Sequence, residues 1–239
     1  MEFEEFKSIM EENLKQINIE KFNAEMIMSF YKYMDLLIEW NKKINLTAIV
    51  EPKEIILKHF IDSLTISKYI DEGMKLIDIG TGAGFPGIPL SIVNNNNIEY
   101  DLVDSLNKRI IFLEEVFNQL KLKNIRAFHS RAEDFIKGKR EEYDIAVSRA
   151  VAPLRILVEY LLPYVKIGGK CICMKGSNYE EELENAKNAI KILGGQIDKV
   201  EQIILPGTEI KRNLIIISKI NKSGNKYPRS AGMPKKNPL

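Results

Sequence analysis

A short apolar run that ends in closely spaced glycines constrains the fold more than any other feature of this sequence. Lys75–Ile79 is mostly apolar with β-branched members, and glycines follow at positions 80, 82, 84 and 87. The run has the pattern of a buried parallel strand. Glycine permits positive φ and lets a ligand approach the main chain, and the start of a following helix offers unpaired N–H groups. A strand, a glycine loop and a helix in this order predict a ligand site where the strand ends.

The glycine spacing fits two classes of ligand. Gly82 to Gly87 matches G-x-G-x-x-G, which occurs in nicotinamide dinucleotide-binding proteins. The register Asp78-x-Gly80-x-Gly82-x-Gly84 instead has an acid at the strand end and three glycines at alternate positions, as in motif I of class I S-adenosylmethionine (SAM) methyltransferases. We favour SAM over the dinucleotide. We favour both over a turn without a ligand, because so many glycines weaken a strand-to-helix junction unless something must approach it.

Length and composition exclude several other classes. The 239 residues accommodate one α/β domain with an appended element, and 45% hydrophobic with 28% charged residues is ordinary for a globular protein. No apolar run approaches the roughly 20 residues of a membrane span, so we expect a cytoplasmic protein. Cys171 and Cys173 alternate along one apolar run and are expected to be buried thiols. The two histidines offer no spacing for a metal cluster, and no metal is expected.

The order of periodic segments predicts the domain organisation. Helical spacing extends over residues 2 to about 70, with Asn23 as an N-cap, and strands and helices then alternate. The last two strands, about 197–205 and 214–220, have no helix between them. We therefore expect an α/β Rossmann-like, doubly wound, seven-stranded, mostly parallel sheet with an antiparallel terminal hairpin. The expected domains are a helical cap (1–70), a SAM-binding domain (71–220) and a basic tail (221–239).

Acidic residues follow two further strands, and ligands of doubly wound sheets bind beyond these strand ends. Asp104, at the end of the second strand, is placed to accept from both ribose hydroxyls, although it can also cap the next helix. Glu133, beyond the third strand, can accept from an adenine amino group while the Ala132 backbone borders the ring. The alternative for Glu133 is an acid in the first turn of a helix.

Three more residues have both a functional and a structural interpretation. Phe85 packs on the cofactor or only on the sheet. Arg149, after the fourth strand, suits the methionine carboxylate of SAM or an RNA phosphate, and a buried salt bridge is the alternative. His59 is either functional or a residue on a helix face that makes one hydrogen bond.

The net positive charge of the chain comes from its C-terminal tail. The net charge of +2 includes five basic residues and no acidic residue between Asn221 and Leu239, so the rest of the chain is slightly acidic. Basic side chains with an aromatic residue among them suit phosphate contact and base stacking. The candidates for RNA contact are Lys226, Tyr227, Arg229, Lys235 and Lys236. An exposed, solvated end is the alternative. We expect deletion of Asn225–Leu239 to leave SAM affinity intact but to lower RNA affinity and its salt dependence.

Together these segments resemble the ribosomal RNA small-subunit methyltransferase G family, also called glucose-inhibited division protein B. The resemblance runs from Trp40 to the last residue and rests on Trp40–Thr47, His59–Leu64, Asp78–Leu90, Val103–Arg109, Arg131–Glu133, Ser148–Ala152 and Tyr227–Leu239. Ser230 stands where many relatives have a basic residue, which lowers the charge of the tail.

The resemblance implies an enzyme that transfers a methyl group from SAM to N7 of a guanine in the 530-loop region of 16S rRNA. Its cofactor positions correspond here to Gly80, Phe85, Ala132, Glu133 and Arg149. Guanine N7 needs no general base, so His59 with Asn41, Asn45 and Thr47 is expected to hold the guanine. The expected partner is 16S rRNA, the small subunit or its assembly precursor, and the protein is expected to be a monomer.

Two other functions remain open on sequence grounds. A dinucleotide-dependent oxidoreductase requires a proton relay, and neither a Tyr-x-x-x-Lys motif nor a well-placed histidine is evident. A non-catalytic RNA-binding factor on the same fold is expected to have lost glycines or a strand-end acid, and this sequence retains both.

Overall fold

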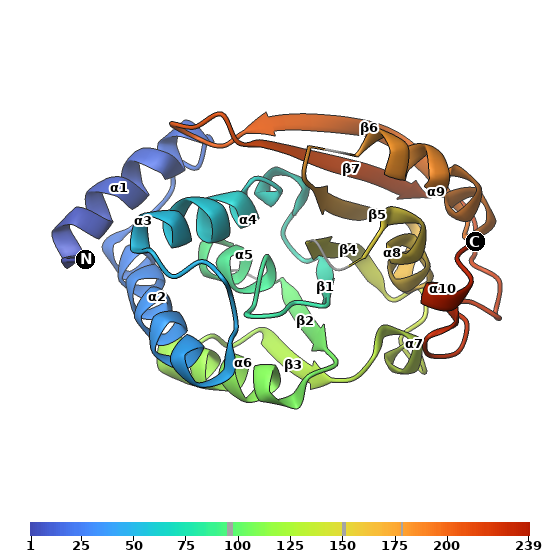
Figure 1. Ribbon diagram of the computed structural model, residues 1–239, viewed down its shortest axis with the longest axis horizontal. Helices are drawn as coiled ribbons and strands as arrows, with labels where there is room; N and C mark the ends of the chain where they lie inside the picture. Colours follow the sequence, from blue (N-terminus) through green and yellow to red (C-terminus); the bar gives the residue numbers. More distant parts are fainter. Residues whose placement is uncertain (95–97, 150–151, 178) are drawn as a thin grey trace.

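A seven-stranded sheet forms the centre of the computed structural model, which describes residues 1–94, 98–149, 152–177 and 179–239 (Figure 1). Its strands are β1 (Lys75–Ile79), β2 (Glu99–Asp104), β3 (Ile125–His129), β4 (Tyr143–Arg149), β5 (Val165–Lys175), β6 (Gly195–Ile204) and β7 (Lys211–Lys219). They lie in the order β3-β2-β1-β4-β5-β7-β6, and β7 is antiparallel to both β5 and β6. The predicted doubly wound sheet with an antiparallel terminal hairpin is confirmed.

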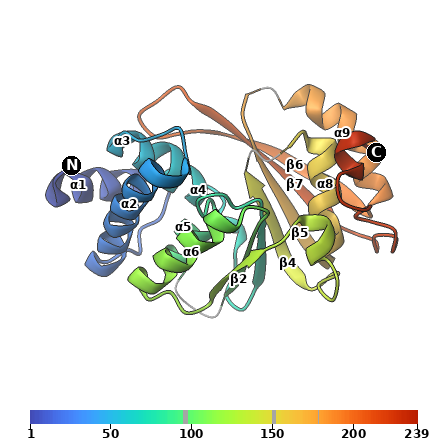
Figure 2. The ribbon, with the colours of Figure 1, turned by 60° about the horizontal axis from the view of Figure 1, so that its bottom comes forward.

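Helices cover both faces of the sheet (Figure 2). One layer holds α1 (Phe3–Gln16), α2 (Ala24–Ile44), α3 (Pro52–Ile55), the π-helix η1 (Ile56–Ile61), α4 (Asp62–Leu64), α5 (Gly87–Val93) and α6 (Asn107–Leu120), and the 3₁₀ turn η2 (Ser67–Tyr69) follows α4. The other holds α7 (Ala132–Phe135), α8 (Leu154–Leu161), the 3₁₀ turn η3 (Leu162–Tyr164) and α9 (Glu180–Ile192).

Alternation along the strands supplies both layers with apolar contacts. On β5, Ile172 and Met174 face the layer of α1 to α6, and Cys171 and Cys173 face the layer of α7 to α9. Each such side chain contributes roughly 1.5–3 kcal/mol when it is fully buried. Both cysteines are buried and free, as the sequence predicted.

The N-terminal helices are continuous with this packing. Asn23 caps α2 by accepting from the backbone N–H of Met26 at 2.9 Å, as predicted, and the helix buries Ile27, Phe30 and Tyr33 on one face. These side chains belong to the same hydrophobic cluster as residues of α5 and α6. The helices ahead of β1 therefore pack against α5, α6 and the glycine loop in one hydrophobic cluster.

Some strands are longer than the apolar pattern indicates. β6 begins at Gly195 and β7 at Lys211, where the predicted strands began at about residues 197 and 214. The extra residues at the start of β7 are polar, and they extend the strand by pairing with β6, Lys211 with Ile204 and Arg212 with Ile203. Periodicity in the sequence does not report such pairing.

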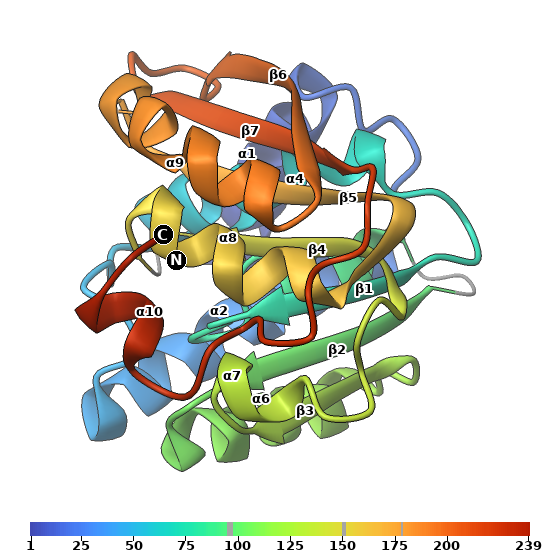
Figure 3. The same ribbon diagram turned by 90° about the vertical axis from the view of Figure 1, so that its right-hand side faces the viewer.

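The chain after β7 folds back across the α7 and α8 side of the molecule and ends in α10 (Met233–Lys236) (Figure 3). The buried ammonium of Lys219 donates to the Leu162 carbonyl and to Ser223 Oγ, each at 2.6 Å. These bonds fix the direction in which the tail leaves the sheet.

Candidate functional site

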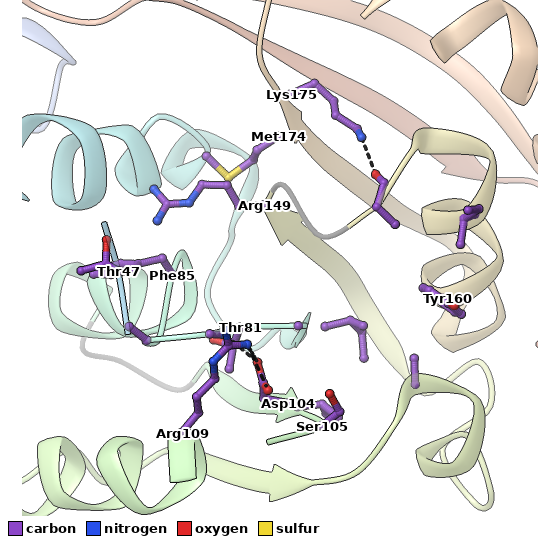
Figure 4. Close-up of a pocket in the computed structure, with 18 of the residues that line it drawn as sticks. Thr47, Thr81, Phe85, Asp104, Ser105, Arg109, Arg149, Tyr160, Met174 and Lys175 are labelled. Carbon is purple, nitrogen blue, oxygen red and sulfur yellow. Dashed lines mark hydrogen bonds and ion pairs between the residues drawn. The ribbon is translucent and has the colours of Figure 1, made fainter. Parts of the chain in front are cut away.

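A cavity of about 1160 Å³ opens at the carboxyl ends of β1, β2, β4 and β5. In Figure 4, Thr47 and Phe85 lie at one side of the hollow and Tyr160 at the other, with Arg149 above and Asp104 below. β1 lies between β2 and β4, so the cavity is at the point where the strand order reverses. Ligands of doubly wound sheets bind at this point.

The glycine loop forms the floor of the cavity and depends on positive φ. Gly82 has φ +63°, and a Cβ there would meet nothing within 4 Å, so the space beside its main chain is open. Gly84 has φ +98°, and a Cβ there would collide with Ile88 and with the Tyr33 hydroxyl. The same hydroxyl of α2 donates a hydrogen bond to the Ala83 carbonyl. Tyr33 was not among the predicted site residues, because a tyrosine on an apolar helix face gives no functional signal.

Asp78 supports this loop from below. Its Oδ2 accepts from Thr81 Oγ1 at 2.8 Å and from the Gly87 N–H at 3.0 Å, while Oδ1 is buried without a partner among the described residues. Burial raises the pKa of Asp78 to about 7. Asp78 and Gly84 do not line the cavity, whereas Gly80, Gly82 and Phe85 do. The structure thus places the predicted acid beneath the ligand-facing surface.

Asp104 lies on the cavity wall with all its acceptor sites near protein donors. Oδ2 accepts from the Gly82 N–H at 2.9 Å, and Oδ1 accepts from the Leu106 N–H at 3.0 Å. Nη1 of Arg109 bridges both oxygens at 3.0 and 3.3 Å. The Arg109 side chain is 31% exposed, so this ion pair borders solvent on one side. No role was predicted for Arg109 from the sequence, although it lies only five residues after Asp104, in the first turn of α6.

Ala132 and Glu133 line the cavity beside the C-terminal tail. Glu133 Oε1 accepts from the Gly232 N–H at 3.0 Å, and Tyr160 of α8 hydrogen-bonds the same carboxylate. Gly232 and Lys235 of the tail also line the cavity. The tail therefore borders the cavity, which weighs against the expectation that its deletion leaves SAM affinity intact.

The placement of the tail also corrects part of the predicted RNA surface. Tyr227 is 6% exposed and packs in the cluster around α8, so its ring face is not free to stack on a base. Arg229 makes a bidentate pair with the fully buried carboxylate of Glu159, at 2.7 Å from Nη2. Lys226, Lys235 and Lys236 are exposed. The sequence shows the five basic residues of the tail, but it does not show that Arg229 is paired with a buried acid.

Arg149 lies in a buried cluster above the glycine loop. Its Nη1 is 3.2 Å from Asp62 Oδ2, and its guanidinium lies 4.9 Å from the centre of the Phe85 ring. Arg212, from β7, pairs with both oxygens of Asp62 at 3.1 Å. Two guanidinium groups on one carboxylate leave a net positive charge at this wall. The salt-bridge alternative for Arg149 is therefore present, together with an unbalanced charge that faces the cavity.

His59 stacks on Phe85 with ring centres 4.4 Å apart, and its nitrogens contact Arg149 and Thr47. Burial, followed by the nearby Arg149 charge, lowers the pKa of His59 to about 3. His59 and Thr47 both line the cavity. Asn41 and Asn45 do not, which contradicts a direct contact of either with a guanine bound there.

The two asparagines have structural partners instead. Asn41 Oδ1 accepts from the backbone N–H groups of Leu46 and Thr47, and Nδ2 donates to the Thr47 carbonyl at 2.9 Å. Asn45 ends α2 in the left-handed conformation with φ 49°. They position the loop that carries Thr47.

Comparison with known proteins identifies the family. The family model described as rRNA small subunit methyltransferase G matches residues 26–215. The chain belongs to this family. The Ribosomal RNA small subunit methyltransferase G of Alkaliphilus oremlandii is 50% identical over 98% of this chain and 99% of that protein. The protein of the same name from Acetivibrio thermocellus is 54% identical over 90% of this chain and 89% of its own length.

Solved structures show the fold of the family in more distant proteins. A SAM-dependent methyltransferase from Aquifex aeolicus has a TM-score of 0.55 at 17% identity, over 76% of this chain and 98% of that one. M. jannaschii TYW2 in complex with AdoMet has a TM-score of 0.54 at 15% identity, over 66% and 75%. The predicted family, fold and SAM dependence are thereby confirmed. A nicotinamide enzyme or a non-catalytic factor is not favoured.

The sequence predicts neither a metal site nor a membrane span, and the structure bears on both predictions for the described part of the chain. Its His, Cys, Asp and Glu side chains include no group of three or more suited to a metal ion. None of its helices combines the length and the apolar character needed to cross a bilayer.

Proposed function

We propose that this protein transfers a methyl group from SAM to N7 of a guanine in the RNA of the small ribosomal subunit, as a cytoplasmic monomer. The observation that carries the proposal is that, in a chain of this family, one cavity at the strand ends is lined by the glycine loop, Asp104, Glu133 and Arg149. The names of the relatives supply the substrate class.

The cavity residues fit SAM in shape and charge. The open space at Gly82 admits a ligand against the main chain. Asp104 is the acceptor for the ribose hydroxyls, which take the place of Arg109. Glu133 and Ala132 border the adenine, and the net positive charge around Arg149 suits the methionine carboxylate. Bound there, SAM supplies a methyl group attached to a positively charged sulfur.

The protein then needs to orient the guanine and not to deprotonate it. Guanine N7 carries a free lone pair on the major-groove edge and is itself the nucleophile. His59 cannot act as a base, because Arg149 donates to its Nδ1 and its Nε2 faces Thr47. Good orientation alone can be worth on the order of 7–11 kcal/mol. Positive charge moves from sulfur to the purine, so Arg149 belongs at the carboxylate end and not beside N7.

The exposed lysines of the tail extend this site toward RNA. Lys235 lines the mouth of the cavity, and Lys226 and Lys236 are exposed on the same tail. We assign them contacts to RNA phosphates, which position a substrate without reading its sequence. Tyr227 and Arg229 instead hold the tail in place.

Two measurements on the purified chain test the proposal. Calorimetric titration with SAM and with NAD should show binding of SAM only. Transfer of label from methyl-labelled SAM should then be measured with bare 16S rRNA and with small subunits that lack this methylation. Binding of NAD, or SAM binding without transfer to either RNA substrate, would contradict the proposal.

A further inference from the structure

The two nitrogens of His59 are held by partners of different kinds. Nη2 of Arg149 lies 3.0 Å from Nδ1, and Oγ1 of Thr47 lies 2.8 Å from Nε2. A guanidinium has only donors, so Nδ1 must be the acceptor in the first contact. The neutral ring therefore carries its proton on Nε2 and donates it to Thr47. The low pKa of His59, caused first by burial and then by Arg149, agrees with a neutral ring.

Because the His59 ring donates to Thr47, the Thr47 hydroxyl keeps its own proton available as a donor. Thr47 Oγ1 accepts from His59 and also from the backbone N–H of Ile49 at 3.0 Å. A hydroxyl oxygen has two lone pairs, and both are now used. Its own proton has no hydrogen-bonded acceptor within the described residues, and Thr47 lines the cavity. Asn41 holds the Thr47 backbone on both sides, so the position of this donor is fixed.

The donor lies away from the part of the cavity assigned to adenosine. Thr47 and Phe85 are on one side of the hollow and Tyr160, which bonds Glu133, is on the other (Figure 4). The region beside Thr47, His59 and Phe85 is thus left for the base that receives the methyl group. A base bound there meets a fixed donor.

We propose that the Thr47 hydroxyl donates a hydrogen bond to O6 of the target guanine and so selects guanine over adenine. The inference rests on the proposed function. Guanine presents N7 and O6 as adjacent acceptors, whereas adenine presents N7 beside an amino donor. Both purines have the reactive N7, so N7 alone does not distinguish them. A donor fixed by His59 and Arg149 favours O6 and is repelled by an amino group, which makes Thr47 a positioning and specificity residue.

A double-mutant cycle between the protein and the base tests this inference. Thr47→Val keeps the shape of the side chain and removes the hydroxyl, and 2-aminopurine at the target position keeps N7 and removes O6. We expect each change alone to lower the single-turnover rate at sub-saturating RNA roughly 10- to 100-fold, the worth of one hydrogen bond to a fixed partner. Combined, they should cost little more than either one, and Thr47→Ser should restore most of the rate with guanine.

Thr208→Val is the matched control. Thr208 Oγ1 accepts from the N–H two residues later, that of Ile210 at 3.1 Å, as Thr47 does from Ile49, but it lies outside the cavity. This control should leave the rate unchanged, and SAM affinity should stay within about twofold of the wild type in every variant. Thermal melts exclude general unfolding as the cause.

The outcomes separate this inference from the function on which it rests. If Thr47→Val weakens SAM binding tenfold, the hydroxyl points at the cofactor and the inference is wrong. If the rate reductions from Thr47→Val and from 2-aminopurine multiply, the two groups are independent and the inference is also wrong, although the enzyme still methylates guanine. If the wild type does not methylate guanine at all, the proposed function fails and the inference fails with it.

Discussion

Asp104 is the single residue on which cofactor affinity should depend most. Replacing Asp104 with Ala removes the acceptor assigned to the ribose hydroxyls. We expect SAM binding to weaken by about 1.5–3 kcal/mol, the worth of hydrogen bonds to a charged group. Isothermal titration calorimetry measures the change.

Asp101 provides the control for that substitution. It lies on the same strand with the same 2% exposure and pairs with Arg126, but it does not line the cavity. Asp101→Ala should lower the unfolding free energy and leave SAM affinity unchanged. If the Asp104→Ala variant binds SAM as tightly as the wild type, Asp104 does not bind the ribose and only supports the glycine loop through Gly82.

His59 should couple stability to acid pH. Its folded pKa of about 3 lies below the ordinary 6.5, so the unfolded chain binds more protons between these values. Its contribution to stability is complete above about pH 6.5 and is lost as the pH falls toward 3, at up to about 1.4 kcal/mol per pH unit. Urea unfolding between pH 7 and 4 should therefore show a shallower loss of stability in His59→Asn than in the wild type.

The titration of Asp78 changes the stability in the opposite direction, so both proteins in this comparison keep Asp78. Its folded pKa is raised to about 7, so the folded state holds the extra proton, and its effect on stability decreases as the pH rises toward 7. The effect is common to the wild type and His59→Asn and cancels in their difference. Parallel curves for the two proteins would mean that His59 titrates normally and that Thr47 is not held as described.

Residue identities were predictable where the strand-end rule applies. Asp104, Glu133 and Arg149 were predicted from their positions after strands, and all three line the cavity. Asn41 was predicted to hold the guanine, but its side-chain oxygen already accepts from the backbone N–H groups of residues 46 and 47. The sequence alone does not show these hydrogen bonds.

At the scale of elements, the C-terminal tail should contribute to cofactor binding. Deleting residues 231–239 removes Gly232, which holds Glu133, and Lys235 from the cavity wall. It retains Tyr227 and the Arg229 pair with Glu159. We expect SAM affinity to fall about tenfold, equivalent to about 1.4 kcal/mol. A shorter deletion of residues 237–239 should have no effect on binding, and equal affinities for both truncations would refute a role of the tail in the cavity.

The lysines of the tail should act on RNA affinity instead. Replacing Lys226, Lys235 and Lys236 with Gln should lower the slope of log K against log salt by about 0.7–0.9 for each phosphate that is no longer neutralised. SAM affinity should fall less than on deletion of residues 231–239, because Gly232 still holds Glu133. A control that replaces Lys15, Lys21 and Lys187, which are exposed and do not line the cavity, removes the same charge. If the wild type and the tail variant show the same slope, these lysines do not contact RNA phosphates and the RNA binds elsewhere on the protein.

Elements were predictable where one period persists along the chain. The alternation of strands and helices after residue 75 and the final hairpin follow from periodicity, and both are present. The π-helix η1, which places His59 on the cavity wall, was not predictable, since its side chains show the same apolar spacing as an ordinary helix. Arg212 was missed because its partner, Asp62, lies 150 residues earlier.

The whole molecule joins two regions that the sequence keeps apart. Helix α2 holds the glycine loop through Tyr33 and is followed by the loop that carries Thr47, while the tail borders the cavity at Glu133 through Gly232. Contacts between distant segments depend on the folded arrangement, which a local pattern does not contain. They explain why one cavity has walls from the beginning, the middle and the end of the chain.

Identification of the methylated nucleoside tests the central claim most directly. The purified protein is incubated with isotope-labelled SAM and small ribosomal subunits that lack this modification, and the RNA is digested for mass spectrometry. The account predicts labelled 7-methylguanosine confined to one fragment of 16S rRNA. Label on a different atom of guanine, on another base or in no RNA product would contradict it.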